Sequence, residues 1–203
     1  MNKYMLAVHP EWLVKILDGE KIFELRKRAP ETPCEIYLYC TKGKPYLFRF
    51  RHNKKFFVSK TLPLGLTYDA LKQVRMNGLV VAKFTLKKVS EVDLSADVVG
   101  GYLLFDAKDP MDEFNGGLMT NTECCLSHDE IIDYANGKRL LAWHISDLVI
   151  FGEPMELRKF SNDYDIFDTD ENGRQVNPYE QTIPLSHAPQ SYMKVEVHGE
   201  NEA

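Results

Sequence analysis

The stretch that decides the fold is Gly19-Glu20-Lys21-Ile22-Phe23-Glu24-Leu25-Arg26, which follows a predicted helix and leads into a predicted strand. Side chains alternate along a strand with a period of two, so Glu24 and Arg26 must project from the same face. Phe23 and Leu25 project from the other face, and their burial would leave the polar pair on the open side of a packed sheet. Lys21 follows the turn at Gly19 and can reach the same space. The pattern predicts a cleft in which a carboxylate, an ammonium and a guanidinium converge.

Hydrophobic periodicity predicts the elements on either side of this stretch. An apolar face at helical spacing after Pro10 indicates a helix over residues 10–17, with Gly19 as its left-handed cap. The residues of that face are Trp12, Leu13, Ile16 and Leu17. Strands are expected over residues 4–8, 24–27, 35–40, 79–86, 140–145 and 192–197, and further helices over 67–76 and 127–134. Short strands with few helices between them favour an α+β fold, a mixed or antiparallel β-barrel, over a doubly wound sheet.

The chain of 203 residues is expected to form a single domain over residues 1–203. Three insertions are expected within it: a basic hairpin at about 42–60, a loop-rich insertion at about 89–122 and an acidic loop at about 162–178. No apolar run approaches a membrane span and the N-terminus lacks the hydrophobic segment of a signal peptide, so a cytoplasmic protein is expected. The four cysteines form no C-x-x-C pair and the histidines lack ligand spacing. We therefore expect reduced thiols, no metal and no cofactor.

Charge is divided unevenly along the chain. Residues 1–88 hold 18 Lys and Arg against 7 Asp and Glu, a net charge of +11, whereas residues 89–203 hold 7 against 23, a net charge of −16. A basic part of this kind suits contact with nucleic acid, and the two parts can equally pair with each other through surface charges. In the hairpin, the candidate nucleic-acid-binding residues are Arg49, Arg51, Lys54 and Lys55. The alternative is a solvated hairpin whose phenylalanines lie in the core.

Segments spread along most of the chain match a known family in order. They are His9-Pro10-Glu11, residues 16–26, Ile36-Tyr37-Leu38-Tyr39 with Lys42-Gly43, Val80-Val81-Ala82-Lys83-Phe84, Trp143-His144-Ile145-Ser146-Asp147-Leu148, Pro154 with Leu157 and Phe160, and Ala188-Pro189-Gln190-Ser191-Tyr192. On these residues the sequence resembles the ASCH family of the PUA-like superfamily, and more narrowly its longer members from phages and mobile elements of Gram-positive bacteria. The resemblance implies a PUA-like mixed β-barrel with flanking short helices, and a cleft lined by residues 19–26.

The resemblance also bears on function. The family is associated with RNA binding and nucleotide-related roles, and some small bacterial members look like amidohydrolases that act on N4-acetylcytidine. Those members carry a Lys that matches Lys21 and an Arg that matches Arg26, but a Thr where this chain has Glu24. The general motif also prefers Thr at the position of Ile22. Neither hydroxyl is present in this chain, although hydrolysis of an amide requires a nucleophile or a water activated by a base.

The candidate ligand-binding residues of the cleft are Lys21, Glu24, Arg26, Tyr39, Trp143, His144, Ser146, Gln190 and Tyr192. Arg26 can clamp a phosphate with two donors, Glu24 can accept hydrogen bonds from exocyclic amines, and Lys21 can supply a point charge. In an enzyme, Glu24 would be the general base on water and Lys21 would stabilise the developing oxyanion. The alternative is a structural ion-pair cluster, with Trp143 as a core residue rather than a stacking surface.

Three functions stay open from the sequence. The first is a non-enzymatic module that binds RNA or a modified nucleotide in the cleft, with the basic hairpin extending the contact. The second is a hydrolase, an amidohydrolase acting on a modified nucleobase such as N4-acetylcytidine. The third is a phage-type protein–protein effector that uses its bipolar charge. The sequence determines neither the ligand nor the oligomeric state.

Overall fold

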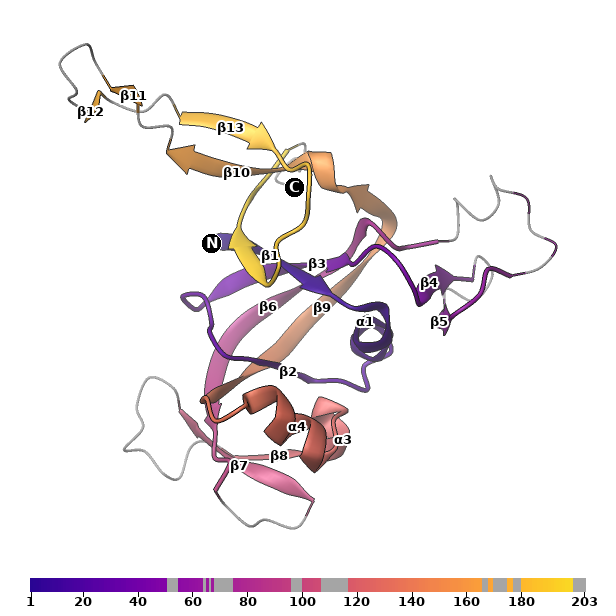
Figure 1. Ribbon diagram of the computed structural model, residues 1–203, viewed down its shortest axis with the longest axis vertical. Coiled ribbons are helices and arrows are strands. Elements are labelled where there is room, and N and C mark those ends of the chain that lie inside the picture. Colours follow the sequence, from indigo (N-terminus) through magenta and orange to yellow (C-terminus); the bar gives the residue numbers. More distant parts are fainter. Residues whose placement is uncertain are drawn as a thin grey trace.

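The computed structural model describes residues 1–50, 55–63, 65, 67, 75–95, 100–106, 117–165, 168–169, 175–176 and 180–198. Two long antiparallel strands run through its centre (Figure 1), β6 (Leu79–Val92) and β9 (Leu140–Glu156). Both strands extend well beyond the predicted ranges, 79–86 and 140–145. The reason is that β6 and β9 pair with each other from Leu79 opposite Glu156 to Val92 opposite Leu140. The continuous backbone pairing keeps both strands extended even where their residues do not alternate clearly between apolar and polar.

Shorter strands extend the sheet on both sides of this pair. They are β1 (Asn2–Val8), β2 (Phe23–Arg26), β3 (Cys34–Cys40), β7 (Gly101–Asp106), β8 (Leu118–Thr120) and β14 (Tyr192–Lys194). The order is β14-β1-β3-β6-β7-β8, and β9 pairs with both β6 and β2. β1 and β3 are parallel and the other pairs are antiparallel. Three register shifts interrupt the β6–β9 ladder, and such irregularities bend strands. The sheet curls into a half-barrel beside a few short helices, which confirms the predicted α+β class.

α1 (Pro10–Leu17) begins and ends where the sequence predicted, α4 (His128–Ala135) lies within one residue of its predicted range, and α3 (Asn121–Cys124) was not predicted. α1 is followed by Gly19 in the left-handed conformation, with φ of +76°. α4 begins with the predicted capping box between Ser127 and Glu130, and α3 has a similar box at Thr120. The predicted helix over 67–76 falls mostly outside the described residues. Among the helices of the described part, none is long and apolar enough to cross a membrane.

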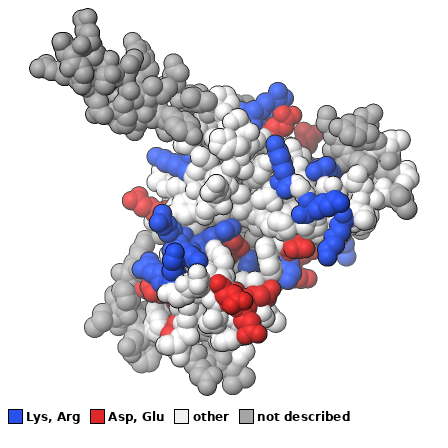
Figure 2. Space-filling view, viewed as in Figure 1, with Lys and Arg blue, Asp and Glu red and all other residues white. Residues whose placement is uncertain are grey.

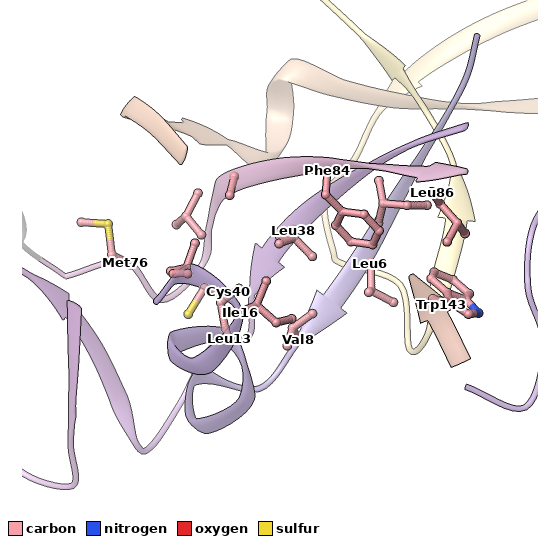
Figure 3. Packing of buried hydrophobic residues seen from close by; sticks show 14 of the residues in the cluster. Leu6, Val8, Leu13, Ile16, Leu38, Cys40, Met76, Phe84, Leu86 and Trp143 are labelled. Carbon is pink, nitrogen blue, oxygen red and sulfur yellow. The ribbon is translucent and has the colours of Figure 1, made fainter. Parts of the chain in front are cut away.

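Buried side chains form three clusters around the sheet. The first packs α1 against β1, β3 and β6, and Figure 3 shows Leu13 and Ile16 of the helix beside Leu38 and Val8 of the strands. The second lies under α3 and α4 and includes Phe23 and Leu25 of β2. The third covers the opposite face of β1 and β3. Burial on both faces explains why the strand over 34–40 is almost uniformly apolar rather than alternating.

Two of the three predicted insertions contain more strand than expected, whereas the basic region was predicted as a hairpin. In the region of the basic hairpin, β4 (Tyr46–Arg49) pairs with β5 (Phe56–Ser59) in antiparallel fashion. In the region predicted to be loop-rich, β6 continues to Val92, and β7 and β8 follow. In the acidic region, the short 3-10 helix η1 (Leu157–Lys159) leads into β10 (Phe160–Asp165), which pairs with β13 (Glu180–Pro184). Between them, β11 (Asp168–Thr169) pairs with β12 (Gln175–Val176). Near the end of the chain, β15 (Glu196–Val197) pairs with the other edge of β10.

Replacing Gly19 by Ala tests the turn that follows α1. No atom lies within 4 Å of the added Cβ, so the cost is the backbone conformation alone, about 1 kcal/mol of unfolding free energy. Gly152→Ala is the matched control, because its Cβ also meets open space while its φ is not positive. Urea unfolding of both variants should show a loss for Gly19→Ala and a change within about 0.5 kcal/mol for Gly152→Ala. Equal values would show that the turn does not depend on glycine.

Candidate functional site

The three charged residues predicted to converge lie together in the structure. β2 directs Glu24 and Arg26 to one face, while Phe23 and Leu25 enter the second core cluster on the other. The Oε1 atom of Glu24 lies 2.9 Å from Nη2 of Arg26, and its Oε2 atom lies 3.6 Å from Nζ of Lys21. We call Lys21, Glu24 and Arg26 the charge triad. It combines one carboxylate with two cations, so it carries one net positive charge.

Lys21 is the most deeply buried member of the triad, with 3% of its surface exposed. Its Nζ donates to the carbonyl of Cys124, 2.6 Å away, at the end of α3. The backbone beside it is tied on both sides, because the amide of Ile22 donates to the carbonyl of Glu123 and the amide of Ile145 donates to the carbonyl of Ile22. The loop after α1 is thus held against α3 and β9, and this positions the ammonium under Glu24.

A cleft of about 500 Å³ opens above the triad. Its volume falls within the range of roughly 300–1,000 Å³ that is usual for small-molecule sites. The triad forms one side of the cleft, α1 and the ends of β1 and β3 form another, and α4 forms a third. The lining residues are Ala7, Val8, His9, Trp12, Lys21, Glu24, Leu25, Arg26, Thr41, Leu126, Glu130, Asp133 and Tyr134. Of the motif over 19–26, Lys21, Glu24, Leu25 and Arg26 therefore line the cleft.

Two buried polar atoms of the cleft residues have no hydrogen-bond partner among the described residues. They are Nε of Arg26 and Oγ1 of Thr41. Nη2 of Arg26 is engaged, since it pairs with Glu24 and also donates to the carbonyl of Ala7 at 3.4 Å. Buried polar groups are hydrogen-bonded as a rule, and an exception calls for an explanation. Both atoms belong to residues that line the cleft.

Trp12 is a cleft residue that the sequence reasoning assigned to the core. The buried residues of α1 are Pro10, Leu13, Ile16 and Leu17, whereas Trp12 is half-buried and lines the cleft. The Nζ atoms of Lys15 and Lys21 lie 5.0 and 5.8 Å from the centre of one of its rings. Its position at the edge of the apolar face, next to His9, was the available signal. Tyr134 of α4 is a second aromatic lining residue that was missed.

Three predicted cleft residues on β9 are engaged in other contacts. Trp143 is fully buried in the first core cluster, as Figure 3 shows, and meets the ring of Tyr192 edge-on at 5.2 Å. His144 shares a 2.8 Å hydrogen bond with Ser90. Burial, assisted by the positive charge of Lys88, lowers the pKa of His144 to about 4. The hydroxyl of Ser146 donates to the carbonyl of Thr85 at 2.7 Å. None of the three lines the cleft.

The remaining predicted residues also lie outside the cleft. Tyr39 is buried in the third core cluster, where burial raises the pKa of its hydroxyl. Gln190 is exposed and does not line the cleft, and Tyr192 lines neighbouring hollows instead. In the hairpin, Nη1 of Arg49 donates to the carbonyls of Phe151 and Gly152 at 2.8 and 3.0 Å. Lys55 is exposed, and Arg51 and Lys54 lie outside the described residues.

Comparisons with known proteins give the following results. No model of a known protein family matches the sequence, and no curated protein matches it. Among solved structures, the chain is similar to the crystal structure of ASCH from Zymomonas mobilis, at 16% identity over 96% of this chain and 88% of that chain, with a TM-score of 0.46. It is also similar to a serine-to-alanine mutant of that protein (16% identity, 96% and 89% covered, TM-score 0.46) and to a tyrosine-to-phenylalanine mutant (16%, 77% and 77%, 0.43). These structural neighbours are ASCH proteins.

Replacing Glu24 by Ala tests the burial of the triad. The change leaves two cations facing each other out of water, and we expect it to lower the free energy of unfolding by about 3 kcal/mol. Glu156→Ala is the control, because Glu156 forms a 2.6 Å pair with Arg158 in which the side chains are 56% and 77% exposed. An exposed pair of this kind contributes less than about 1 kcal/mol. Similar small losses in both variants, measured by urea unfolding, would mean that water screens the triad.

The lowered pKa of His144 predicts a pH dependence of stability. The folded protein keeps this imidazole neutral down to a pH of about 4, against an ordinary value of 6.5. Between these values the unfolded chain binds a proton that the folded chain does not, so stability is lost as the pH falls from 6.5 towards 4. NMR titration should place the transition of His144 at about pH 4. His144→Gln should remove this part of the pH dependence, and a titration near pH 6.5 would contradict the prediction.

Proposed function

We propose that this protein is a member of the ASCH family that binds RNA or a modified nucleotide, with a nucleobase held in the cleft above the charge triad. The observation that carries the proposal is the pair of unsatisfied polar atoms, Nε of Arg26 and Oγ1 of Thr41, in a cleft that Trp12 also lines. The edge of a nucleobase offers acceptors and donors, and its face stacks on aromatic side chains. The cleft supplies groups for both, and the motif over 19–26 supports the family assignment.

Glu24 can take part in recognition although it is paired within the protein. A carboxylate has about four lone-pair sites, and the contacts with Arg26 and Lys21 leave some of them for a ligand. An exocyclic amine, such as that of cytosine or adenine, is the group that a carboxylate accepts from. The two neighbouring cations keep negative charge on Glu24 compatible with its burial. We therefore expect bases that carry an amine to bind better than uracil.

The geometry favours binding over hydrolysis. A general base must reach the water that it activates, and a group that stabilises an oxyanion must have free donors at the reacting atom. Glu24 is held by two cations, and Lys21 donates to a backbone carbonyl as well as facing Glu24. Both residues proposed for hydrolysis are thus committed to holding the loop and the strand together. Lys21 acts as a positioning residue, and Glu24, Arg26 and Thr41 are the proposed contacts with the ligand.

Tryptophan fluorescence tests this proposal directly. The chain has two tryptophans, and Trp143 is fully buried, so quenching by a stacked base reports on Trp12. Cytidine, N4-acetylcytidine, adenosine, uridine and a short single-stranded RNA are the probes. We expect quenching by bases with an exocyclic amine or amide, and Trp12→Ala should weaken binding about 5- to 150-fold, since stacking contributes roughly 1–3 kcal/mol per base.

Phe50→Ala is the matched control for Trp12→Ala. Phe50 is an aromatic residue that is 50% exposed and lines no part of the cleft, so its removal should leave affinity unchanged. Because the Trp12→Ala variant lacks the fluorescent reporter, its binding is measured by calorimetry. The proposal fails if none of the probes binds, or if both variants lose affinity equally. Release of acetate from N4-acetylcytidine would assign the protein as a hydrolase instead.

A further inference from the structure

A second, basic groove lies beside the cleft. Its volume is about 810 Å³, and five cationic side chains line it against two carboxylates. The cations are Lys27, Arg28, Lys87, Lys88 and Arg139. Figure 2 shows Lys and Arg gathered on the part of this face that lies over the turn between β2 and β3. The groove does not include the hairpin that the sequence suggested as the nucleic-acid contact.

A smaller hollow of about 560 Å³ joins the groove to the cleft. It shares Arg26 and Tyr134 with the cleft, and it shares Lys27, Arg28 and Tyr192 with the groove. Among the described residues, no carboxylate lines it. The cleft, the hollow and the groove therefore form a continuous path along the end of β2, and three consecutive cations mark the middle of that path.

The charges around the cleft give the path a direction. On the side of α4, Glu130 and Asp133 line the cleft, and Figure 2 shows acidic side chains gathered over this part of the surface. A phosphate next to a base in the cleft is repelled there. On the side of β2 it meets Arg26, Lys27 and Arg28 instead. The electrostatic field thus favours a strand that leaves the cleft towards the groove.

The cations of the groove are accessible to phosphates. Arg28 is exposed and has no carboxylate partner within the described part of the chain. Lys87 pairs with Asp147, and Arg139 pairs with Glu91, but the paired side chains are between 36% and 61% exposed. Such pairs contribute little and are screened by salt, so a phosphate can compete for these cations.

We propose that the path binds a single-stranded nucleic acid, with one base in the cleft and the adjoining phosphates over Arg28 and in the basic groove. The inference rests on the proposed function, since it takes the cleft as the site of the base. Tyr192, which lines both the hollow and the groove, offers a second aromatic surface for a neighbouring base. Among the ligands that the cleft can accept, the groove thus selects a strand over a free mononucleotide.

The experiment measures the affinity of the double variant Arg28→Gln plus Lys87→Gln for two ligands. One is a single-stranded RNA of about eight nucleotides, and the other is a nucleoside. Both residues are exposed and neither lines the cleft, so folding and nucleoside binding should be unchanged. RNA affinity should fall about 10-fold at 0.1 M salt, and the slope of log K against log salt should become shallower by about 1.4, or about 0.7 for each phosphate that the variant no longer neutralises. A DNA strand of the same sequence shows whether the ribose contributes.

The control is Arg158→Gln plus Lys159→Gln, which also removes two positive charges. Both residues are exposed and line neither the cleft, the hollow nor the groove. It should bind RNA like the wild type. If both double variants bind RNA equally well, the proposal that the groove binds RNA is overturned, and the proposal for the cleft stands. If no nucleoside quenches the fluorescence while RNA binding still depends on the groove residues, the proposed base site in the cleft is overturned instead. Polyglutamate that binds the groove as tightly as RNA would overturn the assignment to nucleic acid.

Discussion

Glu24 is a carboxylate buried between two cations, and the strands and loops around it are held in the positions that keep it paired. Three ions removed from water are tolerated only when they compensate one another. Arg26 meets one oxygen of Glu24, Lys21 faces the other, and Cys124 accepts from Lys21. This constraint ties α1, β2 and α3 together, and β9 holds β2 by pairing along its length.

The same triad shapes the site that opens above it. Its excess positive charge and the consecutive cations at the end of β2 lie opposite the acidic side chains of α4. The cleft therefore separates a wall that suits phosphate from a wall that repels it. Trp12 completes the site as an aromatic surface, because α1 needs only its central apolar residues to fill the core. The packing, the charge and the proposed ligand binding thus depend on one short strand and the turn before it.

The success of sequence reasoning varied from residue to residue for identifiable reasons. Alternation along β2 correctly placed Glu24 and Arg26 together, because β2 pairs without a register shift. Trp143 lies in the core, which the sequence had offered as the alternative to a stacking surface, and His144 pairs with Ser90. On β9, register shifts and pairing with two different strands decide which face is covered, and a sequence read in isolation contains neither. Arg49 also makes contacts that the sequence does not show, since the carbonyls of Phe151 and Gly152 accept from its guanidinium.

The sequence by itself determined the α+β class, the extent of α1, the left-handed turn at Gly19 and the shared face of Glu24 and Arg26. Each of these depends on local spacing, on a cap or on a residue type, and neighbouring residues are sufficient to specify them. Only the tertiary structure decided which aromatic residue lines the cleft. It also decided which cations line the cleft and which form contacts within the protein. Those outcomes depend on segments that meet from afar, as when Lys21 finds its acceptor 103 residues further along the chain.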